Sequence, residues 1–136
     1  MISGCLTIFF IGLRLAGGSW KGEGRVEIFY NGNWGTVCDK YWEMTEARVV
    51  CRQMGFPDAV SAPRSAHFGN GSGQVWLDDV GCSGTESTIE NCPHSGWGVK
   101  DCSHNEEASV ICSSKLYQAR SRYRLLIKHV GKQSFL

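Results

Sequence analysis

Two adjacent carboxylates, Asp78 and Asp79, are the residues of this 136-residue chain whose types and spacing point most clearly to chemistry. Two like charges side by side repel each other unless water, hydrogen bonds or a cation relieves them. The pair follows the short apolar stretch 75–77 and precedes Cys82. The sequence therefore predicts an acidic edge at the end of a strand, held in place by much of the remaining chain.

Catalytic residues are not indicated. A Ser-His-Asp triad needs a positioned base, but no GxSxG or HExxH motif accompanies the histidines. Adjacent carboxylates on a strand point to opposite faces, which does not suit a glycosidase pair. We therefore predict that the chain is not an enzyme. The four histidines are His67, His94, His104 and His129.

A hard cation offers another interpretation of the acidic pair. Calcium takes several oxygen ligands, and two or three carboxylates with carbonyls and water suit weak extracellular binding. Glu106, which follows Cys102 closely, could supply a third carboxylate. The alternative is that Asp78 caps a turn while Asp79 and Glu106 are solvated.

Cysteine is the residue that most constrains the fold. Of seven cysteines, Cys5 stands alone and six fall within residues 38–112, with no CxxC pair to support a zinc or thioredoxin-like site. An even, widely spaced set in a small domain indicates disulfides formed in an oxidising compartment. Spacing alone leaves all 15 pairings of six cysteines open. The six are Cys38, Cys51, Cys82, Cys92, Cys102 and Cys112.

Charge divides the chain into two parts. Six of the 14 basic residues follow Glu107 but none of the 13 acidic residues does, so the body carries 8 basic against 13 acidic residues. The body is about −5 and the tail about +6, and nothing indicates a nucleic-acid partner. We expect residues 113–136 to be a disordered tail, with a basic amphipathic stretch on an anionic membrane as the alternative. Residues 1–12 read as an apolar secretory leader or as a stray extension, in which Cys5 is a free thiol or an intermolecular bridge.

Local patterns predict the elements that position these residues. Residues 25–38 read as a hairpin with Asn31-Gly32 as its turn. A helix is predicted from an N-cap at Thr45 to Gly55, with Cys51 on its buried face. Residues 57–73 read as a loop, residues 85–90 as one helical turn capped by Thr85, and residues 108–112 as a final strand. The loop 57–73 contains an N-glycosylation sequon at Asn70.

Five segments together resemble the scavenger receptor cysteine-rich (SRCR) domain. They are GRVEI at 24–28, WGTVCD at 34–39, ARVVCRQMG at 47–55, VWLDDV at 75–80 and CSHNE at 102–106. The resemblance covers residues 13–112 and implies an α+β domain in which a curved, mostly antiparallel sheet cradles one main helix. It also implies the disulfides Cys38–Cys102, Cys51–Cys112 and Cys82–Cys92. Gly22 and Phe56 stand where the eight-cysteine class has its extra pair, so the resemblance is to the six-cysteine class, group A.

The resemblance also implies binding sites. Family members bind a divalent cation through the residues that match Asp78, Asp79 and Glu106, so calcium is the expected cofactor. A second family site would involve Asp39 and Asn105, but Lys40 replaces an aspartate there and makes it doubtful. Four arginines could form a cationic cluster for polyanions, or could be scattered over a solvated face. They are Arg25, Arg48, Arg52 and Arg64.

The expected function is that of an extracellular ligand-binding module of the scavenger-receptor type, either secreted or part of a membrane protein's ectodomain. Calcium-assisted recognition of polyanionic or microbial surface ligands, or of an extracellular protein, is expected, with membrane contact only through a parent receptor or the basic tail. Two alternatives remain. One is an accessory SRCR domain of a larger secreted enzyme such as a protease or amine oxidase; the other is a metal-free structural adhesion module.

Overall fold

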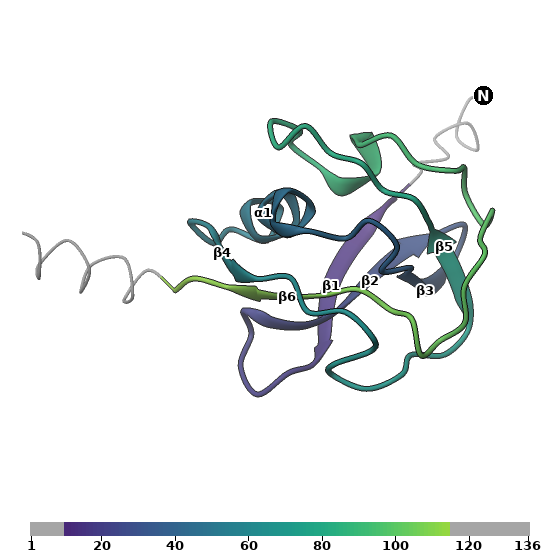
Figure 1. Ribbon diagram of the computed structural model, residues 1–136, viewed down its shortest axis with the longest axis horizontal. Helices are drawn as coiled ribbons and strands as arrows, with labels where there is room; N and C mark the ends of the chain where they lie inside the picture. The colour runs from purple at the N-terminus through teal and green to yellow at the C-terminus, as the bar shows by residue number, and fades with distance from the viewer. Residues whose placement is uncertain (1–9, 115–136) are drawn as a thin grey trace, which may run out of the picture.

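The computed structural model describes residues 10–114, and it forms six strands, one α-helix and a short 3₁₀ helix (Figure 1). Residues 1–9 and 115–136, including Cys5, lie outside the described residues, and so do the predictions made for the leader and most of the tail. In chain order the elements are β1 (Gly12–Gly17), β2 (Glu23–Tyr30), β3 (Asn33–Val37), α1 (Met44–Gln53), β4 (Ala59–Ser61), β5 (Gln74–Leu77), η1 (Ile89–Asn91) and β6 (Ser109–Cys112).

Strand β2 is the centre of the sheet. One of its edges pairs along its length with β1, from Gly12 opposite Phe29 to Gly17 opposite Gly24. The other edge is shared, because β6 pairs with its first half and β3 with its second half. The path β4-β6-β2-β3-β5 is antiparallel except for the parallel β3–β5 pair. The sheet curls against α1, as Figure 1 shows, so the predicted architecture is confirmed.

The β2–β3 hairpin forms where it was predicted. Asn31 and Gly32 have φ angles of 49° and 82°, the left-handed conformation that a two-residue hairpin turn needs at both central positions. Asparagine and glycine adopt this conformation at the least cost, which is why this dipeptide fixes the register of the hairpin.

Helix α1 begins earlier than the sequence predicted. The N-cap is Glu43 and not Thr45, and the backbone N–H of Glu43 donates to the Glu46 carboxylate at 2.9 Å. Glu43 and Glu46 form a capping box, which pairs backbone N–H groups that would otherwise lack a partner at the helix start. Thr45 therefore lies inside the first turn of the helix and does not cap it. Gly55 follows the helix with φ 93°, and Cys51 is buried, both as predicted.

Two local predictions are corrected in the segments after the helix. Residues 57–73 are not all loop, because Ala59–Ser61 forms β4 and pairs with β6 about fifty residues later. The helical turn capped by Thr85 is also wrong, since η1 starts after Thr88. The carboxylate of Glu86 instead accepts the N–H groups of Ser83 and Gly84 at 2.8 and 2.9 Å, which closes a tight non-helical turn.

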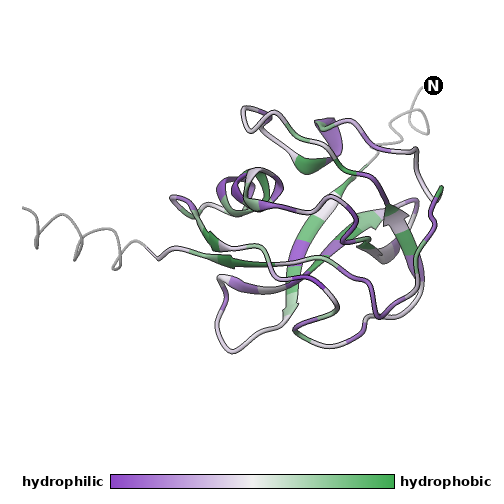
Figure 2. Ribbon diagram, in the orientation of Figure 1, coloured by the Kyte–Doolittle hydropathy of each residue, from purple (hydrophilic) through white to green (hydrophobic). Residues whose placement is uncertain are grey.

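The core lies between the sheet and α1, and in Figure 2 the apolar residues gather on the strands that face it. Trp42 is completely buried there, and its indole N–H donates to the Ser109 carbonyl at 2.9 Å. Trp76 is buried as well, so packing is the role of both tryptophans. No helix within residues 10–114 is long and apolar enough to cross a bilayer.

Three disulfides fasten this core, and they are the three pairs that the family resemblance implies. Cys51–Cys112 ties α1 to β6 across 61 residues, Cys38–Cys102 spans 64 residues, and Cys82–Cys92 closes a local loop. Because long loops lose the most entropy on cross-linking, the first two restrict the unfolded chain the most.

Candidate functional site

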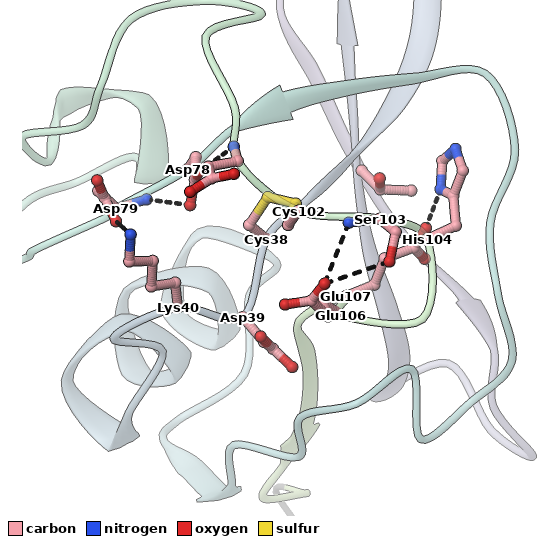
Figure 3. The surroundings of a disulfide bond; sticks show 12 residues. Cys38, Asp39, Lys40, Asp78, Asp79, Cys102, Ser103, His104, Glu106 and Glu107 are labelled. Carbon is pink, nitrogen blue, oxygen red and sulfur yellow. Dashed lines mark hydrogen bonds and ion pairs between the residues drawn. A yellow bond between two sulfur atoms is a disulfide. The ribbon is translucent and has the colours of Figure 1, made fainter.

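The candidate site is an acidic edge around the Cys38–Cys102 disulfide, made of Asp39, Asp78, Asp79, Asp101 and Glu106 (Figure 3). Strands β3 and β5 are parallel, so their carboxyl ends lie side by side, and the Cys38 N–H donates to the Leu77 carbonyl at 2.9 Å. The disulfide then brings the segment that starts at Cys102 to the same place.

Asp78 is a buried structural residue in this edge. Its side chain is turned inward, and the residue is only 2 % exposed. One carboxylate oxygen accepts the N–H of Asp79 at 2.8 Å, and the other accepts the N–H of Asp101 at 2.7 Å. Two backbone donors stabilise its charge, as expected for an aspartate that caps a turn.

Asp79 points away from its neighbour because its backbone is left-handed, with φ 53°. One carboxylate oxygen accepts the Ser95 hydroxyl at 3.1 Å, and the other lies 3.6 Å from Nζ of Lys40. Asp79, with smaller contributions from Asp78 and Asp101, raises the pKa of the Lys40 ammonium. The repulsion in the acidic pair is therefore relieved by backbone donors on one side and by a lysine on the other.

Glu106 lies on the other side of the disulfide in Figure 3. It is exposed, and its carboxylate accepts the N–H and hydroxyl of Ser103 at 3.4 and 3.2 Å. Its carbonyl accepts the Asp39 N–H at 2.9 Å, while the Asp39 carboxylate accepts the Ser65 N–H at 2.7 Å. Asn105 is hydrogen-bonded to the Ser103 hydroxyl. Of the expected second site, Asp39 thus fixes the distant loop at Ser65, and Asn105 belongs to a local turn.

The carboxylates expected to bind calcium do not converge. Within residues 10–114, two groups of three cysteine, histidine or acidic residues have ligand atoms within 4.8 Å of one another, and neither contains Asp79 or Glu106. Each group includes both sulfurs of a disulfide, and metals bind the thiolate form of cysteine. The arrangement of these side chains does not fit the expected site of three carboxylates. One reason is Lys40, whose ammonium lies beside the Asp79 carboxylate where a bound cation would be expected.

Each of the four arginines has a partner within the domain. No two of them share a partner. Arg25 binds Glu27 and the Gly69 carbonyl, and Arg48 pairs with Asp58. Arg52 donates to the Gly84 carbonyl, and Arg64 donates to the Trp42 carbonyl. Carbonyl and carboxylate partners hold these side chains on the domain's own loops. The arginines are thus engaged by internal contacts, and their role in binding polyanions stays a prediction.

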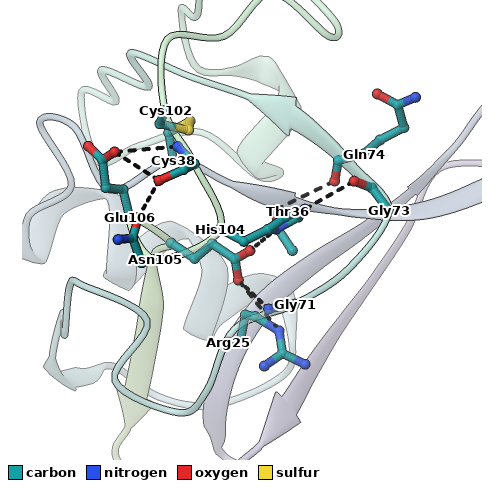
Figure 4. A network of polar contacts seen from close by, with 12 residues as sticks. Arg25, Thr36, Cys38, Gly71, Gly73, Gln74, Cys102, His104, Asn105 and Glu106 are labelled. Atoms are coloured by element: carbon teal, nitrogen blue, oxygen red, sulfur yellow. Dashed lines mark hydrogen bonds and ion pairs between the residues drawn. A yellow bond between two sulfur atoms is a disulfide. The ribbon is translucent and has the colours of Figure 1, made fainter.

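A second polar centre, around Glu107, was not predicted from the sequence; Figure 4 labels the residues around it, Arg25, Gly71 and His104. Glu107 is 0 % exposed, and its carboxylate accepts the Gly71 N–H at 2.8 Å and pairs with Nδ1 of His104. The other ring nitrogen of His104 lies 3.1 Å from the Gly73 carbonyl, and Arg25 lies 3.8 Å from Glu107. The signal available in the sequence was a second acidic pair, Glu106-Glu107, beside a histidine.

This centre holds the loop that carries the sequon. Asn70 is exposed, whereas a Cβ added at Gly71 would meet Thr36 at 2.6 Å and the Glu107 carboxylate at 3.1 Å. The close backbone approach to Glu107 therefore requires glycine beside the glycosylation site. Asn70 remains a predicted glycosylation site, and its exposure is compatible with it.

A separate cavity of about 350 Å³ lies where the β1–β2 connection meets the end of α1. It is lined by Trp20, Lys21, Met54, Gly55, Phe56 and Ser114, and the rings of Trp20 and Phe56 pack edge to face at 5.5 Å. Among these lining residues Lys21 is the one that carries a charge.

Comparison with known proteins agrees with this architecture. Residues 16–113 match the family model for the scavenger receptor cysteine-rich domain. The solved third SRCR domain of murine neurotrypsin is 43 % identical, with a TM-score of 0.70 over 76 % of this chain and 96 % of that domain. The matched domains are non-enzymatic modules, although some lie in enzyme-containing parents.

Two curated relatives show how this domain is used in longer proteins. Macrophage scavenger receptor types I and II of Mus musculus is 51 % identical over 102 residues, which cover 75 % of this chain and 22 % of the relative. Lysyl oxidase homolog 2 of Gallus gallus is 51 % identical over 106 residues, which cover 77 % of this chain and 14 % of the relative. The chain thus spans less than a quarter of the length of either relative.

Proposed function

The chain belongs to the scavenger receptor cysteine-rich family, and from this premise we propose that it is an extracellular ligand-binding module that recognises a protein partner. We assign it to the six-cysteine class, because Gly22 and Phe56 occupy the positions of the extra cysteine pair. The binding module would be residues 13–112, flanked by the short segments 1–12 and 113–136.

The charge of the domain carries the choice of a protein over a polyanion. Residues 10–114 contain 8 basic and 13 acidic residues, a net charge of −5. The four arginines that could offset this charge locally are engaged by acidic side chains and carbonyls of the same chain. Because like-charged surfaces repel, a sulfated or phosphorylated polymer is disfavoured and a partner with basic residues is favoured.

The exposed side of the acidic edge also has the character of a protein contact. Tyr41 is 65 % exposed beside Lys40, and its φ angle of 63° is costly for an aromatic residue. Such strain is concentrated at functional sites, and tyrosine is enriched in protein interfaces. Tyr41 with the half-buried carboxylate of Asp79 and the exposed carboxylate of Glu106 therefore offers a mixed aromatic and acidic contact surface.

An extracellular location follows from the covalent chemistry. A domain of about a hundred residues with three disulfides is typical of an oxidising compartment, and sequons such as the exposed one at Asn70 are glycosylated in the secretory pathway. The domain contains no catalytic constellation within its described residues. We propose no calcium-dependent step, because the expected ligands do not converge.

A second candidate is an accessory role within a larger secreted enzyme. The 51 % identity with a domain that makes up 14 % of lysyl oxidase homolog 2 favours it. In that case the same surface would bind a substrate or a matrix protein for a catalytic domain outside this chain. The coding sequence on either side of this segment would distinguish the two candidates.

A binding screen tests the proposal. The full chain, biotinylated, is presented to an array of extracellular proteins, to heparin and to fixed bacteria. We expect saturable binding to one or more proteins and none to heparin. Tyr41→Asn should weaken that binding at least about tenfold, since an anchoring interface aromatic contributes roughly 2 kcal/mol or more. The matched control is Val60→Asn, another exposed apolar residue on β4. Saturable heparin binding without any protein partner would contradict the proposal.

A further inference from the structure

We propose that Lys40 is the built-in counter-ion of the acidic edge and that it makes this edge independent of calcium. The inference deepens the proposed function, since an edge neutralised from within the chain needs no metal to fold or to meet a protein partner. The residues expected by family resemblance to bind a cation do not converge in this chain, and Lys40 takes over the neutralisation of Asp79.

A rigid turn places Lys40 at this position. The N–H of Trp42 donates to the Asp39 carbonyl at 2.9 Å, so residues 39–42 form a tight turn with Lys40 and Tyr41 at its centre. The turn is fixed at one end by the Cys38–Cys102 disulfide and at the other by the buried indole of Trp42. Both ends are rigid, and the lysine stem therefore starts from a defined point beside Asp79.

The ammonium meets an oxygen that has little else to bind. One carboxylate oxygen of Asp79 has no hydrogen-bond partner among the described residues, and this same oxygen lies 3.6 Å from Nζ of Lys40. Asp78 and Asp101 add negative potential around the ammonium. The contact is thus an ion pair at the point of the edge where negative charge is least satisfied by hydrogen bonds.

Calcium would compete poorly for this place. It takes six to eight oxygen ligands at about 2.3–2.6 Å. Both carboxylate oxygens of Asp78 already accept backbone N–H groups, and Glu106 lies across the disulfide. A divalent ion approaching Asp79 would also be repelled by the ammonium at short range. The ammonium therefore disfavours the ion electrostatically, and the hydrogen bonds of Asp78 leave the ion few free oxygen ligands.

Isothermal titration of the full chain with calcium chloride alone tests this inference. We expect no saturable heat from the wild type at concentrations up to about 10⁻³ M, the weak end of extracellular calcium modules. Lys40→Gln replaces the ammonium with an amide oxygen, and we expect this variant to give saturable heat with calcium below about 10⁻³ M. Lys40→Gln combined with Asp79→Asn should return to the wild-type result.

The controls separate charge from position. Lys21→Gln removes the same charge in the connection between β1 and β2 and should leave the titration unchanged. Lys40→Met repeats the test with a side chain of similar length if the glutamine variant does not fold. Saturable calcium binding by the wild type that Asp79→Asn removes would overturn the inference, and so would a folded Lys40→Gln that ignores calcium. No partner protein is needed, so failure here is distinguishable from failure of the proposed function.

Discussion

The chain contains two adjacent acidic pairs, Asp78-Asp79 and Glu106-Glu107, and the structure treats them alike in one respect. In each pair one carboxylate is buried and bound, Asp78 at 2 % and Glu107 at 0 % exposure, while its neighbour is less buried: Asp79 is half-buried and Glu106 is exposed. Placing neighbours on opposite sides of the backbone relieves their repulsion without any metal. An acidic pair in a sequence is therefore weak evidence for a cation site.

The pairs differ in what neutralises them. The Asp78 carboxylate is held by two backbone N–H groups, whereas Glu107 is surrounded by the side chains of His104 and Arg25 as well as the Gly71 N–H. Among the less buried members, Asp79 has the Lys40 ammonium and Glu106 has only neutral Ser103 donors. Buried ionic partners should make Glu107 important for stability, and the less buried members should matter for binding.

The largest effect is expected from the disulfide that joins the two pairs. Replacing Cys38 and Cys102 with serine should lower the free energy of unfolding by about 4 kcal/mol, because the bridge closes a loop of 64 residues. Removing Cys82–Cys92, with its separation of 10, should cost closer to about 3 kcal/mol. Urea unfolding followed by tryptophan fluorescence measures both. Equal losses would mean that chain entropy does not set the contribution of these bridges.

The next effect separates the two buried carboxylates. Glu107→Gln weakens the charge-assisted contacts with His104 and the Gly71 N–H, each worth about 1.5–3 kcal/mol, and removes one of the two carboxylates near Arg25, which keeps Glu27. Asp78→Asn loses one charge-assisted acceptor of a backbone N–H, worth about 1.5–3 kcal/mol. Urea midpoints should therefore fall further for Glu107→Gln. If Asp78→Asn proves the more destabilising, the ionic surroundings of Glu107 contribute less than backbone hydrogen bonds.

Much of the fold was predictable because its signals are local. Asn31-Gly32 can hardly be anything but a hairpin turn, and the spacing of Ala47, Val50 and Cys51 defines a helix face that agrees with their burial. Strand β4 was missed because three residues carry no period and their partner β6 lies far along the chain. The helix start was predicted wrongly because threonine is a common N-cap residue and glutamate is not, whereas the N-cap in the structure is Glu43.

The site was less predictable because its geometry depends on distant residues. The sequence indicated that Asp78 and Asp79 matter, but their directions follow from the N–H of Asp101, the hydroxyl of Ser95 and the left-handed backbone of Asp79. None of these can be read from the acidic pair itself. The departure at Lys40 was visible in the sequence, whereas its pairing with Asp79 required the parallel β3–β5 ends to be placed side by side.

A carboxylate outside both pairs gives a pH-dependent comparison. Backbone N–H donation, chiefly from Ser83, lowers the pKa of Glu86 from 4.5 to about 2. A depressed folded-state pKa contributes stability that is present above 4.5 and is lost as the pH falls toward 2. Thermal melts of the wild type and Glu86→Gln should therefore differ at pH 6 and converge by pH 2. The side chain is exposed, so the difference should be small, and a constant difference across this range would contradict the assignment.

The smallest effects on stability are expected at the less buried members of the pairs. Asp79→Asn removes one side of a solvent-exposed ion pair with Lys40, and Glu106→Gln keeps an oxygen that can still accept from Ser103. Exposed ion pairs contribute about 0–1 kcal/mol, so the melting temperature of each variant should shift by only a few degrees at most. Partner binding should nevertheless fall in both variants, since each loses a charge from the proposed contact surface. A variant that melts like the wild type but binds its partner less would show that its carboxylate serves recognition. A large loss of stability would instead show that the carboxylate is structural, as those of Asp78 and Glu107 are.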